Sequence, residues 1–273
     1  MLSLIPIHDA NPTQRKPLLT LGFIVLCVVA WLQTPGLGGN SESLEYFYAH
    51  APVPCQALED RCPNEVSLGT DSTGRELTIE VDDPSTGPFI FSMLFSTFLH
   101  GGLLHLAGNM VFLWVFGNNI EDNLGHVRYG LFYLLGGLAA SSAHVLWALR
   151  DVSDACLQNA AACESIQPYV PSVGASGAVA AVMGAYIVLF PRARVRTLVI
   201  FFFITVIEMS AFAVLALWFV YQFIIAAQEL AGEANEVAWM AHVGGFVFGA
   251  IAIFLLGGRP RRRQTSWQTE WRY

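Results

Sequence analysis

Four polar residues in apolar surroundings have the side chains that acyl-transfer chemistry needs: Ser176, His242, His105 and Asn109. A serine becomes a nucleophile when a neutral histidine accepts its proton. Histidine and asparagine side chains can donate hydrogen bonds to the oxyanion that forms when a carbonyl is attacked. His105 and Asn109 share one face of a helix, because they are four residues apart. The set therefore predicts a serine hydrolase with a nucleophile, a base and two oxyanion donors.

Small residues flank both Ser176 and His242 and would let the two helices that carry them approach closely. They are Gly174 and Gly177 around the serine, and Gly245 and Gly249 after the histidine. Close approach would bring the serine hydroxyl within hydrogen-bond reach of the imidazole. No acidic residue neighbours either one in the sequence, which favours a dyad over a triad. We expect the backbone N–H of Ser176, supported by Gly174, to be the first oxyanion donor, aided by the positive end of its helix.

The composition excludes several classes of protein. Of the 273 residues, 54% are hydrophobic and 13% are charged, whereas soluble domains average about 25% charged residues. With a mean hydropathy of +0.50, the chain is predicted to be a polytopic membrane protein with one membrane domain. The net charge of −7 argues against a nucleic-acid-binding protein. The zinc-protease motif HExxH does not occur in the sequence, which argues against that class of metalloprotease.

Six apolar segments are long enough to be membrane-spanning helices. They comprise residues 17–37, a stretch within 95–119, 129–149, 173–190, a stretch within 198–227 that begins with a short interfacial run at 199–203, and 238–256. The predicted fold is an all-α bundle of six spans, with a cytoplasmic segment 1–16, a membrane domain 17–257 containing a long outer loop 38–88, and a basic tail 258–273. Because spans two, four and six run in the same direction, the four polar groups are expected at one depth near the outer face. Ser176 is expected about five residues into the fourth span.

Basic residues set the predicted orientation, because lysine and arginine gather in cytoplasmic loops. With six spans most of them fall on one side, so both termini are predicted to be cytoplasmic. Those on the predicted inner side are Arg15, Lys16, Arg128, Arg192, Arg194, Arg196, Arg259, Arg261, Arg262, Arg263 and Arg272. We expect the outer loop to be partly helical on the bilayer surface. Glu121 is expected to brace the inner turn, and Glu208 to pair with a cytoplasmic arginine.

Four of the five cysteines fall on the predicted outer side, where disulfides persist. Cys55 and Cys62 lie in the outer loop, and Cys156 and Cys163 lie in the third connection with the same spacing. We predict the local disulfides Cys55–Cys62 and Cys156–Cys163, while pairing between the two loops stays open. A zinc site is the weaker alternative, because the C-x-x-C spacing is absent.

Taken together, these motifs resemble those of the rhomboid intramembrane serine proteases of the bacterial type, over nearly the whole six-span core. The matching runs are His100-x4-His105-x3-Asn109, Gly174-x-Ser176-Gly177, Ala241-His242-x2-Gly245-x3-Gly249 and Gly117-x3-Glu121-x3-Gly125. The resemblance implies that Ser176 is the nucleophile and His242 the general base. It also implies that His105 and Asn109 support the oxyanion, and that His100 is structural near the outer loop. Single-span membrane proteins would be the substrates, cut without a cofactor or metal.

Two positions depart from the pattern of that family. Phe91-Ser92 stand where many members carry Trp-Arg in the first outer loop. Ala180 stands where members often carry an aromatic residue that stacks on the catalytic histidine. We therefore expect His242 to be held less tightly or by another group.

Three functions remain open at the level of the sequence. The leading hypothesis is an endopeptidase in a bacterial cytoplasmic membrane, with spans two and five bordering the gap through which a substrate helix enters from the bilayer. A catalytically silent rhomboid-like protein would bind or escort membrane helices, but inactive relatives lack the serine or the histidine and this chain keeps both. A small-solute transporter or channel would also use intramembrane polar groups. It would need them at mid-depth as well, whereas here they cluster near the outer face.

Overall fold

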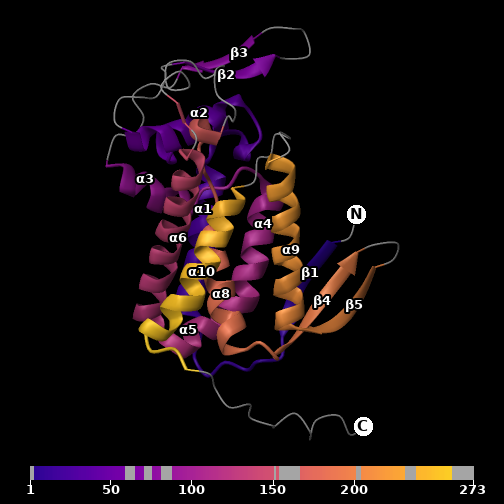
Figure 1. Cartoon of the computed structure of the whole chain (residues 1–273). Helices are drawn as coiled ribbons and strands as arrows, with labels where there is room; N and C mark the ends of the chain where they lie inside the picture. The colour runs from indigo at the N-terminus through magenta and orange to yellow at the C-terminus, as the bar shows by residue number, and fades with distance from the viewer. Residues whose placement is uncertain are drawn as a thin grey trace, which may run out of the picture.

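Apolar helices standing side by side make up most of the molecule in the computed structural model (Figure 1). The structure describes residues 3–58, 65–70, 76–80, 88–150, 152–153, 167–200, 204–230 and 238–259. The α-helices are α1 Leu18–Gln33, α2 Ser41–His50, α3 Phe89–Ser96, α4 Leu103–Phe112, α5 Asn118–Leu124, α6 His126–Ala148, α8 Ser176–Leu189, α9 Ala211–Leu230 and α10 Trp239–Leu255. A π-helical turn, Leu113–Gly117, joins α4 to α5 without a break. Short 3₁₀ turns lie at Pro35–Gly38, Pro54–Leu58 and Gln167–Tyr169.

Each of the six predicted spans corresponds to an apolar helix. Among the described residues, Leu103–Leu124 and His126–Ala148 are long and apolar enough to cross a membrane, and the other four helices are shorter. The second span begins at Leu103, inside the predicted stretch, because the adjacent glycines Gly101 and Gly102 interrupt the helix and set α3 apart from α4. His100 therefore lies in the turn between these helices and not inside a span. The second span ends at Leu124, five residues beyond the predicted limit.

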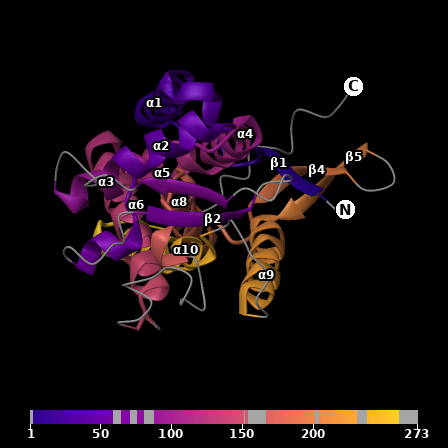
Figure 2. The same cartoon turned by 90° about the horizontal axis from the view of Figure 1, so that it is seen from above.

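Helix α8 lies at the centre of the bundle, as seen from above in Figure 2. Its residues from Gly177 to Tyr186 are all buried. Helix α10 packs directly against it: a Cβ atom on Gly249 would overlap the carbonyl of Ala181, and one on Gly245 would overlap the carbonyl of Gly177. The backbones of the two helices touch at these points, so the predicted pairing of spans four and six through small residues is confirmed.

A three-stranded antiparallel sheet in the order β1-β4-β5 stands beside α9 (Figure 1). Its strands are β1 Ser3–Asp9, β4 Arg194–Ile200 and β5 Ile204–Ser210. The prediction of an all-α fold is wrong here. The expected interfacial run falls partly in β4, and its residues 201–203 lie outside the described part of the chain. Strands β4 and β5 form because valine, threonine and isoleucine dominate their sequences. The third strand, β1, comes from the N-terminal segment 1–16, for which no strand was predicted.

Charged and polar groups tie the basic connections together at one end of the bundle. Glu121 is completely buried and accepts hydrogen bonds from the backbone N–H groups of Leu19 and Thr20, both at 2.8 Å. It thus satisfies the first turn of α1, whose N–H groups have no partner within the helix. Glu208 lies 3.4 Å from Arg194 and 3.5 Å from Arg196. The expected bracing role of Glu121 and the expected pairing of Glu208 are both confirmed.

The opposite end of the bundle carries α2, α3 and the hairpin of β2 Glu65–Thr70 and β3 Glu76–Glu80 (Figure 1). The partly helical character predicted for the outer loop is thus confirmed, whereas its contact with a bilayer stays a prediction. Two hydrogen bonds attach this region to the segment before α8. The hydroxyl of Tyr48 donates to the carbonyl of Tyr169 at 2.8 Å, and the N–H of Ser172 donates to the carbonyl of Pro52 at 3.0 Å.

The cysteine prediction is tested in part. Cys27 is free and buried in α1, as expected for a core residue. Cys55 is buried and disulfide-bonded. Cys62, Cys156 and Cys163 lie outside the described residues, so the pairing stays a prediction.

Peptide mapping of the unreduced protein decides that pairing. We expect one cross-linked peptide that joins Cys55 to Cys62 and another that joins Cys156 to Cys163. A peptide that joins Cys55 to either cysteine of the third connection would contradict the local pairing and show that the two outer loops are linked.

A buried carboxyl group anchors the N-terminal strand to the bundle. Asp9 is 4% exposed and accepts hydrogen bonds from the amide of Asn119 at 2.9 Å and the hydroxyl of Tyr186 at 2.5 Å. Burial raises the pKa of Asp9 to about 6, although both hydrogen bonds act in the opposite direction. Because the folded pKa exceeds the unfolded value, this group stabilises the fold most at low pH, and the contribution is lost as the pH rises through about 6.

We therefore expect the protein to become more stable as the pH falls from about 7.5 to about 5, by an amount on the order of 1 kcal/mol from this group. Asp9→Asn keeps an acceptor oxygen but cannot ionise, so its stability should vary less over that range. Thermal unfolding in detergent at several pH values measures the difference between the two proteins. Parallel curves for the wild type and Asp9→Asn would show that Asp9 does not titrate there.

Candidate active site

Ser176 is the first residue of α8, and an extended segment leads into it. Gly174 has φ +135°, a conformation that favours glycine, and its N–H donates to the carbonyl of Ser96 at 3.0 Å. The prediction that Ser176 lies about five residues into the span is wrong, because this extended segment delays the start of the helix. Ser176 therefore lies at the positive end of α8, where backbone N–H groups point out of the helix.

Helix α10 brings its histidine to that serine. Nε2 of His242 lies 2.8 Å from Oγ of Ser176, although 66 residues separate the two in the chain. His242 is 8% exposed and Ser176 is half-buried. Gly245, about one turn after His242 on α10, closely contacts the carbonyl of Gly177, the residue that follows Ser176 on α8. The structure therefore brings together the two residues for which the sequence predicts a catalytic dyad.

His105 lies on the other side of the entrance to α8. A Cβ atom on Gly174 would lie 2.9 Å from Nε2 of His105 and 3.5 Å from Oγ of Ser176, so both groups border the same point. The side chain of Asn109 donates to the carbonyl of His105 at 3.0 Å, one turn earlier on its own helix. Its amide has a second N–H, which a ligand can use.

The remaining histidine of the predicted set stands behind His105. His100 is completely buried, its Nδ1 lies 3.2 Å from the carbonyl of Phe98, and its ring centroid lies 5.3 Å from that of His105. It reaches neither Ser176 nor His242 through any contact among the described residues. This placement supports the structural role that the resemblance implies.

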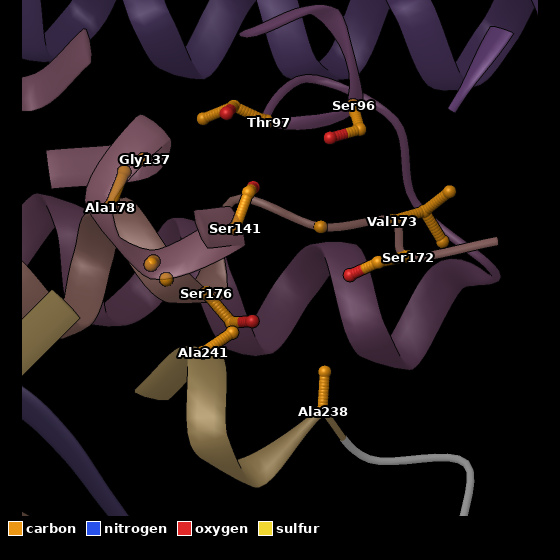
Figure 3. Close-up of a pocket in the computed structure, with 13 residues that line it drawn as sticks. Ser96, Thr97, Gly137, Ser141, Ser172, Val173, Ser176, Ala178, Ala238 and Ala241 are labelled. Carbon is orange, nitrogen blue, oxygen red and sulfur yellow. The ribbon is translucent and has the colours of Figure 1, made fainter. Parts of the chain in front are cut away.

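A small cavity adjoins Ser176 (Figure 3). Its lining combines small apolar residues with hydroxyl groups from α3, α6, α8 and the segments that adjoin α3 and α8. The hydroxyl-bearing residues are Ser96, Thr97, Ser141, Ser172 and Ser176. An ordered water molecule inside a protein needs about two to four polar partners. The hydroxyl groups of this lining can supply them, so the cavity suits an ordered water molecule.

Two residues at the site were missed by the sequence analysis, and both come from α9. Oε1 of Gln222 lies 2.7 Å from Nδ1 of His242, and the ring of Trp218 lies 5.5 Å from the imidazole. Because Ala180 cannot stack on His242, we expected another group to hold this histidine, and Gln222 and Trp218 contact it in that role. The available signal was an amide in the middle of an apolar helix, where a polar side chain needs a partner.

Comparison with known proteins identifies the sequence pattern that surrounds this site. Residues 89–259 match the family described as the Rhomboid domain. The chain is 32% identical over 176 residues to RHOMBOID-like protein 2 of Arabidopsis thaliana, a stretch that covers 64% of this chain and 44% of that protein. It is 30% identical over 172 residues to the mitochondrial presenilin-associated rhomboid-like protein of Mus musculus, covering 61% and 38% of the two chains.

A third relative, the mitochondrial RHOMBOID-like protein 6 of Arabidopsis thaliana, is 28% identical over 176 residues, covering 64% of this chain and 46% of that protein. The matches thus span less than half the length of these curated relatives. All three relatives are eukaryotic, and they do not support the bacterial type or the bacterial membrane predicted from the sequence.

Proposed function

Because the chain belongs to the rhomboid family of integral membrane proteins, we propose that it is a serine endopeptidase that cleaves the transmembrane segments of other membrane proteins. Ser176 is the nucleophile and His242 the general base. The observation that carries the proposal is the distance of 2.8 Å between Oγ of Ser176 and Nε2 of His242. That distance is within the range required for proton transfer from a serine to its base.

Acylation begins when Nε2 of His242 takes the proton from Ser176. The freed Oγ attacks the carbonyl carbon of the scissile peptide bond, and the carbonyl oxygen becomes an oxyanion. Backbone N–H groups at the start of α8 and the side chains of His105 and Asn109 are the donors for that charge. The protonated His242 then gives its proton to the leaving amine, the C–N bond breaks, and an acyl-enzyme remains on Ser176.

Deacylation repeats these steps with water in place of the serine. His242 takes a proton from a water molecule, whose oxygen attacks the acyl carbon. The proton then returns to Oγ as the carboxylic acid product leaves. The hydroxyl-lined cavity beside Ser176 supports this step, because it can hold water at a site that is otherwise surrounded by apolar helices.

The arginine-rich end of the bundle is assigned to the cytoplasmic side by the positive-inside rule. Ser176, at the opposite end of α8, then lies near the outer face, within reach of water. We propose that spans two and five, α4 and α9, border the gap that admits a substrate helix. Suitable substrates are single-span proteins with small or helix-breaking residues near the cut, because a peptide bond inside a helix cannot present its carbonyl to the serine. A bacterial cytoplasmic membrane is the location predicted from the sequence alone, and the eukaryotic relatives add no support for it.

A cleavage assay tests the proposed function. The purified protein in detergent, incubated with a model single-span substrate, should cut it at one or a few bonds near the outer end of the segment. Ser176→Ala should lower the rate by about 10⁴-fold or more. Absence of cleavage by the wild type would favour the silent, helix-binding alternative. Equal cleavage by both proteins would show that Ser176 is not the nucleophile.

A further inference from the structure

Helix α9 contributes a polar side chain to the catalytic histidine. Gln222 is 3% exposed, and its Oε1 lies 2.7 Å from Nδ1 of His242. Trp218, one helical turn earlier, places its ring 5.5 Å from the same imidazole. One face of α9 is therefore aimed at the base.

The position of the amide oxygen decides where the imidazole carries its proton. A neutral imidazole has one N–H, and the other nitrogen is an acceptor. If Nδ1–H donates to Gln222, Nε2 is the acceptor, and this is the nitrogen 2.8 Å from Ser176. The opposite tautomer would direct an N–H at the serine hydroxyl and could not take its proton.

We propose that Gln222 is a positioning residue that fixes the tautomer and orientation of His242, so that the site is competent only while α9 packs against the bundle. The inference rests on the proposed function and deepens it. In this arrangement an amide takes the place of the carboxylate of a catalytic triad. An amide accepts the same hydrogen bond without placing a charge inside the membrane, where an ionised group is costly.

The packing of α9 supports the link between its position and the site. In α8 almost every residue is buried, whereas α9 buries few of its described side chains, among them Leu215 near its start and Gln222 near its middle. Large apolar residues on its other faces are exposed. They are Phe212, Leu217, Val220, Tyr221, Phe223 and Ile224. A helix with few buried contacts separates from its neighbours at low cost, and if α9 separates, His242 loses its acceptor.

Variants of the full-length protein in detergent test the role of Gln222. Gln222→Met is similar in size and lacks an acceptor, so kcat should fall about 100-fold while KM changes little. Gln222→Glu keeps an acceptor oxygen, so kcat should stay within about tenfold of wild type. Because a carboxylate stabilises imidazolium, the acid limb of its pH–rate profile should move to higher pH. Val220→Met is the matched control on an exposed face of α9 and should behave as wild type.

These outcomes separate this inference from the proposed function. Wild-type rates for Gln222→Met, or equal losses in Gln222→Met and Gln222→Glu with an unchanged pH profile, would overturn the role of Gln222 while the dyad stands. If Gln222→Met has a much lower melting temperature than the wild type, its low activity could reflect instability. The shift of the pH–rate profile in Gln222→Glu then decides the role of Gln222. If the wild type does not cleave at all, the proposed function fails and this role fails with it.

The link to the position of α9 has its own test. Leu215→Ala weakens the packing of α9 away from the site. It should lower kcat in the wild-type background and cause little further loss in Gln222→Met, because residues that act through one contact are not additive. Equal losses in the two backgrounds would show that α9 does not act through Gln222.

Discussion

Replacing His242 by alanine is expected to lower kcat for cleavage by about 10⁴-fold to 10⁶-fold, the range found when the base of a serine protease is removed. The hydroxyl of Ser176 would lose the only acceptor that the described residues place within hydrogen-bond distance of it, at 2.8 Å. KM should change little, because the imidazole contacts Ser176, Gln222 and Trp218 within the enzyme. Steady-state rates on a single-span substrate measure both constants.

His144 provides the matched control for this change. It is a second buried histidine, 4% exposed, near the C-terminal end of α6. In the described part of the chain it makes no hydrogen bond to Ser176, and its Nδ1 has no hydrogen-bond partner there. His144→Ala should therefore reduce kcat far less than His242→Ala. Equal losses in the two variants would indicate general damage to the bundle and would contradict a specific role for His242 as the base.

Gly249→Ala is expected to destabilise the protein by about 3 kcal/mol and to reduce kcat by about 100-fold. The added methyl group would overlap the carbonyl of Ala181, where the backbones of α8 and α10 touch. The helices must separate or tilt to accept it. Because Ser176 is on α8 and His242 on α10, that movement also lengthens the distance between the two catalytic groups. Thermal unfolding in detergent and the cleavage rate measure the two effects.

Gly22→Ala is the matched control, because a Cβ atom on Gly22 of α1 would meet no atom within 4 Å. Alanine is the better helix former by about 1 kcal/mol, so this variant should be as stable as the wild type or slightly more stable. If Gly249→Ala unfolds at the same temperature as Gly22→Ala, the two helices do not depend on glycine for their contact.

The contact between Ser176 and His242 was predictable because each of the two residues carries a local signal. Ser176 and His242 are polar groups in apolar segments, and the small residues beside each of them indicate a close contact between their helices. The positive-inside rule then predicts that both residues lie near the same face of the membrane. The exact start of α8 was not predictable, because it depends on the hydrogen bond of Gly174 to the carbonyl of Ser96, from a distant part of the chain.

The three-stranded sheet and the contact of Gln222 with His242 could not be predicted from the sequence, each for its own reason. Residues 194–210 are as apolar as a span, and apolar content alone does not separate a buried strand from a helix. The strand Ser3–Asp9 joins them through pairing across almost 200 residues of chain. Gln222 contacts His242 only because α9 is rotated so that this face meets α10. Rotation of a helix follows from packing, which local patterns do not encode.

Covalent labelling with a fluorophosphonate is the sharpest test of Ser176 and His242 as a catalytic pair. A fluorophosphonate phosphonylates a serine that a base has activated, with loss of fluoride, so it reports on the dyad without needing a substrate. We expect one adduct in the wild type, which mass spectrometry locates on Ser176, and none in Ser176→Ala or His242→Ala. An adduct on another serine, or undiminished labelling of Ser176→Ala, would contradict the assignment of Ser176 and His242 as the catalytic pair.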